Sequence, residues 1–263
     1  MTPETTSLDR LAGDWRIHQL VGGHRFSADD LFTAWVAAES CPRAQRLLDL
    51  GAGIGSVGLM TLWRMQPTAT LVGLEAQEVS HVLMRRTVDT NQLSARVECR
   101  LGDLRDAACV PEGRVFDLVT GSPPYIPLGK GVVSPHPQRA ACRMELRGSI
   151  ADYALAAART VREDGSFVVC FAAADPRGEP AIAAAGLSLR VRQDVVFRGR
   201  QAPLITIFVA THEAGPCDRR APFCIRGPDG EWTEAYFEMR RQMGTDVARP
   251  ARPSADEVDV DRG

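Results

Sequence analysis

The 263-residue chain lacks several features that mark particular classes of protein. No apolar run approaches the roughly 20 residues of a membrane-spanning helix, and residues 1–10 are polar and acidic, unlike a secretory signal peptide. The seven cysteines have no Cys-x-x-Cys spacing, which argues against zinc and predicts free thiols in a reducing compartment. The net charge of −2 provides no general basic field for nucleic acid, and Lys130 is the one lysine. We therefore expect a soluble, cytoplasmic protein that binds neither a membrane nor a metal ion.

A glycine-rich turn is the most informative feature that is present. The apolar run 46–50 ends in a turn that contains Gly51, Gly53 and Gly55, and an apolar-periodic segment follows. This order predicts a strand, a tight turn and a helix. Glycine lets the backbone approach a ligand closely, and such a turn after the first strand of an α/β sheet binds nucleotide-like cofactors. The third glycine comes one residue too early for a dinucleotide turn, and the Gly-Lys-Ser/Thr of a Walker loop is missing.

Segments of strand and helix type alternate along the chain after residue 45. Strands are expected at 46–50, 69–74, 96–101, 115–120, 166–171, 189–197 and 204–210, and helices at 55–65, 79–91, 150–161 and 180–185. This alternation predicts an α/β fold with a doubly wound, mostly parallel sheet of seven strands. The short linker 198–203 suits a hairpin, which makes the last strand antiparallel.

The core, 46–212, is expected to carry a segment on either side. Residues 1–45 form an N-terminal cap segment, with a frayed start over 1–15, a short strand or hairpin near 17–24 and a helix after the N-cap Ser27. Residues 213–244 form a C-terminal extension packed on the core, with a short strand at 222–225 and a helix at 233–243. The Pro-, Asp- and Arg-rich residues 245–263 are expected to be a disordered tail.

Acidic residues stand at the ends of the first three strands. Asp49 lies one residue before the glycine turn, Glu75 follows the second strand and Asp103 follows the third. The two oxygens of a carboxylate placed like Glu75 can accept hydrogen bonds from both hydroxyls of a ribose. Because the carboxyl ends of parallel strands meet at one edge of a sheet, these positions predict a cofactor site there.

The run Asp-Leu-Gly-Ala-Gly-Ile-Gly at residues 49–55 resembles motif I of class I S-adenosylmethionine (AdoMet)-dependent methyltransferases. The resemblance implies a Rossmann-like class I methyltransferase fold with AdoMet as the cofactor. It implies that Asp49, Gly51, Gly53 and Gly55 form the cofactor loop, with the glycines along the methionine and ribose part. It also implies that Asp103 binds the exocyclic amine of the cofactor's adenine.

The predicted fourth strand ends in Thr-Gly-Ser-Pro-Pro-Tyr, residues 120–125. Two prolines cannot continue a strand ladder, so the chain must leave the sheet here. The run resembles motif IV of enzymes that methylate a planar, sp² nitrogen. The resemblance implies that the Ser122 side chain and the Pro123 carbonyl accept the hydrogens of the amine, that Pro124 shapes the same catalytic turn, and that Tyr125 stacks on the acceptor. Many adenine and glutamine enzymes have Asn where this chain has Ser122, and Ser is the variant found in N4-cytosine DNA enzymes.

Residues 23–31, 138–145 and 229–233 extend the match. Together with the two motifs they resemble the bacterial tRNA (adenine-N6)-methyltransferase group over about residues 15–243. In this reading Arg25 and Ser27 lie on a segment that closes over the cofactor. Lys130, Arg139 and Arg143 lie in the long insert after the fourth strand, where basic side chains can contact the phosphates of RNA.

The main prediction is therefore an AdoMet-dependent N-methyltransferase that acts on adenine N6 in tRNA or another RNA. The same chemistry allows other acceptors: glutamine N5 in a protein, a DNA base or a small molecule. Glutamine enzymes usually carry Asn-Pro-Pro-Tyr and a larger N-terminal domain, and no DNA target-recognition domain is visible. A non-catalytic AdoMet-binding module is a further alternative, against which the presence of both motifs argues. The sequence does not indicate an oligomeric state.

Overall fold

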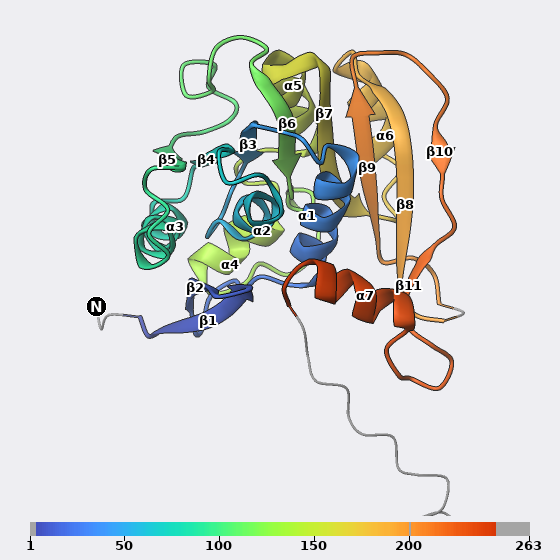
Figure 1. Ribbon diagram of the computed structural model, residues 1–263, viewed down its shortest axis with the longest axis horizontal. Coiled ribbons are helices and arrows are strands. Elements are labelled where there is room, and N and C mark those ends of the chain that lie inside the picture. The colour runs from blue at the N-terminus through green and yellow to red at the C-terminus, as the bar shows by residue number, and fades with distance from the viewer. Residues whose placement is uncertain (1–3, 200, 246–263) are drawn as a thin grey trace, which may run out of the picture.

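A mostly parallel, nine-stranded sheet forms the centre of the molecule within residues 4–199 and 201–245, which the computed structural model describes (Figure 1). Its main strands follow the order β5 (Val97–Leu101), β4 (Thr70–Glu75), β3 (Arg46–Leu50), β6 (Phe116–Gly121), β7 (Val161–Ala172), β9 (Ile205–Thr211) and β8 (Ser188–Arg198). Strand β9 is antiparallel to both of its neighbours. The predicted α/β doubly wound fold is confirmed, and all seven predicted strands are present with the last one antiparallel. The sheet has nine strands rather than seven because two short strands of the C-terminal extension also join it.

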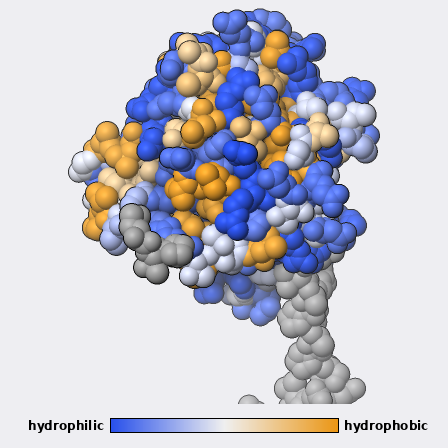
Figure 2. Space-filling view, turned by 90° about the vertical axis from the view of Figure 1, so that its left-hand side faces the viewer, coloured by the Kyte–Doolittle hydropathy of each residue, from blue (hydrophilic) through white to orange (hydrophobic). Residues whose placement is uncertain are grey.

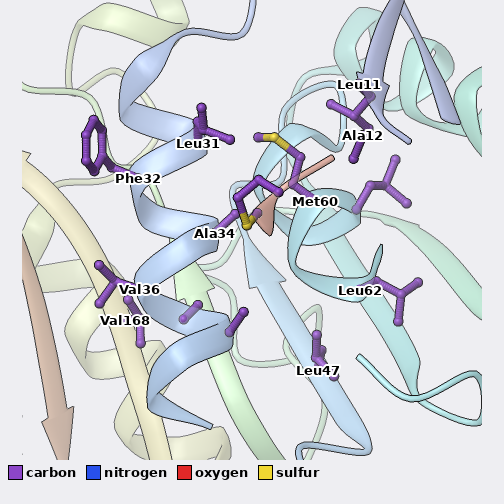
Figure 3. Close-up of a cluster of buried hydrophobic side chains, with 14 of the residues drawn as sticks. Leu11, Ala12, Leu31, Phe32, Ala34, Val36, Leu47, Met60, Leu62 and Val168 are labelled. Carbon is purple, nitrogen blue, oxygen red and sulfur yellow. The ribbon is translucent and has the colours of Figure 1, made fainter. Parts of the chain in front are cut away.

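Helices cover both faces of the sheet and bury a separate core on each. The helices of one face are α1 (Ala28–Ser40), α2 (Ser56–Arg64) and α3 (Glu78–Thr90), and those of the other are α5 (Ile150–Thr160) and α6 (Gly178–Ala184). Side chains along a strand alternate between the faces, so Val168 and Cys170 of β7 join the α1 core while Val169 joins the α5 core. Figure 3 shows α1 between Val168 on one side and Met60 of α2 on the other.

The N-terminus differs from the prediction. Residues 1–15 were expected to be frayed, but β1 (Thr6–Ala12) pairs with β2 (Trp15–Leu20) in an antiparallel hairpin. The hairpin is held because Leu11 and Ile17 are fully buried in the α1 core and because the backbone N–H of His18 donates to Thr87 Oγ1 of α3 at 3.0 Å. The expectation was wrong for β1 because tertiary packing, rather than local pattern, orders this segment.

The C-terminal extension joins the central sheet. Strands β10 (Asp218–Arg219) and β11 (Phe223–Arg226) each pair with β8 in parallel, which adds two short strands at that edge. Helix α7 (Glu234–Gln242) and β11 both pack on α1, since the rings of Tyr236 in α7 and Phe223 in β11 lie 6.1 and 5.0 Å from the ring of Phe32. The predicted tail, apart from Thr245, lies outside the described residues.

The insert after β6 contains α4 (Pro137–Arg143), a short helix that the sequence pattern did not predict. It lies below the sheet in Figure 1, just above the β1–β2 hairpin. The face that carries α3 and β5 is mostly polar, with small separate apolar patches (Figure 2). Among the described residues, no helix is both long and apolar enough to cross a membrane.

Candidate active site

A cavity of about 360 Å³ opens at the carboxyl ends of β3, β4 and β6. Its volume lies within the range of about 300–1,000 Å³ that is typical of small-molecule sites. The glycine loop, the Ser-Pro-Pro-Tyr turn, the start of α1 and the inner side of α4 all contribute to its wall. Of the predicted site residues, it brings together Ser27, Asp49, Gly51, Gly53, Glu75, Ser122, Pro123, Pro124, Tyr125 and Arg143.

The glycine loop has the shape that the motif predicts. Gly51 and Gly53 have φ values of +60° and +58°, in the left-handed region where glycine is favoured. A Cβ on Gly51 would overlap the Tyr153 hydroxyl, whereas a Cβ on Gly53 would have no heavy atom within 4 Å. Gly53 therefore leaves open space in the cavity wall that a ligand can fill. Gly55 does not line the cavity but caps α2 with φ +92°.

Glu75 supports the loop and still has hydrogen-bonding capacity. It is only 5% exposed, and its carboxylate accepts from the backbone N–H of Gly53 at 2.7 Å and of Gln77 at 2.6 Å. Burial raises the pKa of this carboxyl group, and the two backbone N–H groups counteract that rise. A carboxylate has about four lone-pair sites, so each oxygen can accept one more hydrogen bond. The open space at Gly53 and this buried acceptor fit the ribose of AdoMet.

Asp49 lies beneath the loop. Its carboxylate accepts from the backbone N–H of Gly58 at 2.9 Å and from Thr120 Oγ1 at 2.7 Å. Burial raises its pKa to about 6. These bonds tie the first turn of α2 to β6, so Asp49 holds the loop in place and also forms part of the cavity wall.

Besides Gly55, two predicted cofactor residues, Asp103 and Arg25, lie outside the cavity wall. The Asp103 carboxylate pairs with Arg105 at 2.6 Å, which lowers the pKa of Asp103, while its neighbours Gly102 and Leu104 line the cavity. Arg25 pairs with Asp9 of β1 at 2.9 Å. Asp103 and Arg25 therefore each form an ion pair with another residue of the protein. The spacing of the motifs does not predict these pairs.

The Ser-Pro-Pro-Tyr turn is held in place by residues on other elements. Tyr125 donates its hydroxyl hydrogen to Asp29 Oδ2 at 3.1 Å, and its ring meets that of Phe171 edge to face at 5.7 Å. Ser122 Oγ lies 3.2 Å and Tyr125 Oη 3.0 Å from Cys170 Sγ. Asp29 and Cys170 were not among the predicted site residues. Asp29 lies in the noted stretch 23–31, whereas no sequence signal marks Cys170.

The predicted basic residues of the insert are placed differently from one another. Arg143 is exposed at the cavity wall, and Arg147, which is also exposed, lines the same cavity. Arg139 instead donates to the backbone oxygens of Gly22 and Gly23 at 2.9 and 3.2 Å, which fastens α4 to the N-terminal segment. Lys130 is exposed in the loop before α4, outside the cavity wall.

Four carboxyl groups line the cavity, those of Asp29, Asp30, Asp49 and Glu75. Burial, reinforced by the neighbouring Asp29, raises the pKa of Asp30 to about 7. The cavity wall also contains the basic side chains of Arg143 and Arg147, so groups of both signs line it. Among the described residues, no group of three or more His, Cys, Asp and Glu side chains could hold a metal ion.

Comparison with known proteins agrees with this geometry. Residues 28–133 match the family model of the methyltransferase small domain. A tRNA1(Val) (adenine(37)-N6)-methyltransferase from Cronobacter sakazakii is 29% identical over 216 residues, which cover 80% of this chain and 83% of that protein. The protein of the same name from Escherichia coli is 27% identical over 212 residues, with the same coverage of 80% and 83%.

The similarity of this chain to solved structures concerns the fold alone. A predicted O-methyltransferase from Agrobacterium tumefaciens superimposes with a TM-score of 0.61 at 20% identity, over 84% of this chain and 99% of that one. The resemblance to the bacterial tRNA (adenine-N6)-methyltransferase group is confirmed by the relatives above. Together these findings show an AdoMet-dependent methyltransferase with the class I fold, in which residues 28–133 match the model of the methyltransferase small domain.

Proposed function

We propose that this enzyme methylates an exocyclic amine, and that the amine is adenine N6 in tRNA. The observation that carries the proposal is that the Ser-Pro-Pro-Tyr turn and the glycine loop line one cavity. A methyl donor held by the loop and a planar amine held by the turn would therefore meet. The names of the two relatives support adenine in tRNA as the acceptor.

The proposed chemistry depends on hydrogen-bond acceptors rather than on a strong base. The lone pair of an exocyclic amine is delocalised into its ring, which makes the amine a poor nucleophile. Ser122 Oγ and the Pro123 carbonyl would accept its two hydrogens and direct the lone pair toward the methyl group. The Tyr125 ring would stack on the base, and base–aromatic stacking contributes about 1–3 kcal/mol. Orientation of the two reactants would provide most of the rate enhancement.

On the cofactor side, AdoMet supplies a methyl group that its sulfonium already activates. We propose that Glu75 accepts the ribose hydroxyls and that the backbone at Gly51 and Gly53 borders the cofactor. Asp49 would act indirectly, through the loop that it holds. Because Asp103 is paired with Arg105, the adenine would be met first by Gly102 and Leu104, which line the cavity.

On the substrate side, we propose that Arg143 and Arg147 at the cavity wall contact RNA phosphates, with Lys130 further out. Arg139 would contribute by holding α4 in position. A tRNA substrate also supports a cytoplasmic location.

The test is to incubate the protein with methyl-labelled AdoMet and separate fractions of tRNA, DNA and cellular protein. Label in the tRNA fraction is the expected result. Label in glutamine of the protein fraction, or in cytosine of the DNA fraction, would overturn the proposed acceptor while leaving the methyltransferase assignment intact.

A further inference from the structure

Cys170 sits directly beneath the catalytic turn. In the register of β6 and β7, Gly121 is opposite Val169, so the next residues, Ser122 and Cys170, are level with each other. The thiol is fully buried at 0% exposure, and its sulfur contacts Ser122 Oγ at 3.2 Å and Tyr125 Oη at 3.0 Å. One sulfur atom thus connects the two side chains on which catalysis would depend.

The number of hydroxyl and thiol hydrogens determines which groups donate and which accept in the contacts around the Cys170 sulfur. Tyr125 has a single hydroxyl hydrogen, which goes to the Asp29 carboxylate at 3.1 Å, because a carboxylate is the strongest acceptor nearby. Thr33, which also contacts the thiol, gives its hydroxyl hydrogen to the backbone oxygen of Asp29 at 2.7 Å. Burial raises the pKa of Cys170 to about 12, so the thiol keeps its hydrogen and can donate it to either of these oxygens.

Ser122 is the remaining hydrogen-bond partner of Cys170. In the part of the protein that the structure describes, the Cys170 sulfur is the hydrogen-bond partner of the Ser122 hydroxyl. With the thiol hydrogen directed to Tyr125 or Thr33, the sulfur is free to accept from Ser122. The serine oxygen would then present only lone pairs to the cavity.

We propose that Cys170 is a positioning residue, which holds the Ser122 hydroxyl so that its oxygen faces the cavity as a hydrogen-bond acceptor. The inference deepens the proposed function, on which it rests. It also gives a reason why serine can stand where related enzymes have asparagine. The carbonyl of an asparagine is an acceptor in itself, whereas a serine hydroxyl rotates and needs a partner to accept its hydrogen.

The test compares turnover of Cys170→Ala and Cys170→Ser with the wild-type enzyme. Cys170→Ala should lower kcat about tenfold while the Kd for AdoMet stays within twofold. Cys170→Ser keeps an acceptor and a donor and should retain kcat within threefold. Cys99→Ala, which removes a half-buried thiol of β5, is the matched control and should leave kcat unchanged. Thermal unfolding confirms that each variant is folded.

The same substitution in a Ser122→Ala enzyme distinguishes a positioning role of Cys170 from a packing role. If Cys170 acts through Ser122, then Cys170→Ala should cost less than twofold in kcat when Ser122→Ala is already present. A full tenfold loss in that background would overturn the proposal, as would a Cys170→Ala enzyme with wild-type kcat or a Cys170→Ser enzyme as slow as Cys170→Ala.

The assay uses whichever macromolecule the wild-type enzyme labels from AdoMet. A wrong acceptor would therefore refute the proposed function without affecting this comparison. Failure of the Cys170 proposal would appear instead in the kcat values of the variants on the true acceptor, as one of the overturning outcomes given above.

Discussion

The Glu75 carboxylate provides a quantitative test of the cofactor side of the site. Its oxygens accept backbone N–H groups from Gly53 and Gln77 at 2.7 and 2.6 Å, which leaves about two of its roughly four lone-pair sites for a ribose. We predict that Glu75→Ala weakens AdoMet binding, because it removes both acceptors at once. It also releases the backbone of Gly53, which borders the same cavity.

The size of the effect follows from the hydrogen bonds. A hydrogen bond to a charged group contributes about 1.5–3 kcal/mol, so losing two costs at least about 3 kcal/mol, or about a 100-fold rise in Kd. Glu75→Gln keeps one oxygen and should raise Kd about tenfold. Glu98→Ala, on the adjacent strand β5, removes an exposed carboxylate paired with Arg100 and should leave Kd unchanged.

Isothermal titration calorimetry with the full chain measures these constants, and thermal unfolding shows whether each variant is folded. A folded Glu75→Ala protein whose Kd for AdoMet lies within threefold of the wild-type value would refute the assignment of Glu75 to the ribose.

Three other predictions concern the remaining parts of the site. Tyr125→Ala and Pro124→Ala should each lower kcat at least tenfold with the AdoMet Kd unchanged by calorimetry, and normal turnover in either would remove that residue from the catalytic turn. Arg143→Ala should raise the KM for tRNA and reduce the slope of log K against log salt by about 1, while Arg85→Ala on α3 should not; equal slopes would contradict the phosphate contact. The stability of Asp30→Asn relative to wild type should increase as pH rises. Because the pKa of Asp30 is raised to about 7 in the folded protein, the folded wild type keeps a proton that the unfolded chain has lost, and it therefore loses stability between about pH 4 and 7. From pH 5 to 8 the gain in free energy of unfolding should be about 2–3 kcal/mol in urea titrations, and a pH-independent difference would refute it.

The sequence predicted the parts of the fold that local pattern determines. The apolar run and glycine turn at 46–55 gave β3 and the start of α2, and the N-cap Ser27 marked the start of α1. In α1 the backbone N–H of Ser27 donates to Asp30 at 3.1 Å, which completes the predicted first turn. These features depend on residues within a few positions of one another.

The features that were missed depend on distant contacts. Strand β1 exists because Leu11 is buried by helices that come later in the chain. Helix α4 is fastened by Arg139 and by Gln138, whose side chain accepts from the His24 backbone at 3.1 Å and donates to Ser80 at 3.1 Å. Neither partnership leaves a periodic signal in the sequence.

The same distinction applies to the site. Glu75 and the Ser-Pro-Pro-Tyr turn were identified because they end strands, and parallel strands bring such positions to one edge. The sequence could not show where Asp103 and Arg139 point. The Asp103 side chain is held by Arg105, two residues away, and the Arg139 side chain by a backbone oxygen over 100 residues away. Cys170 became visible only through the register of β6 and β7.

Nucleoside mass spectrometry of tRNA methylated in vitro identifies the atom that the enzyme methylates. The purified protein, AdoMet and unmodified tRNA are incubated, the tRNA is digested to nucleosides, and the methylated products are identified. We predict N6-methyladenosine with the wild-type protein and a loss of that product with Tyr125→Ala. A methyl group on a ring nitrogen, on a ribose oxygen or on another base would contradict it.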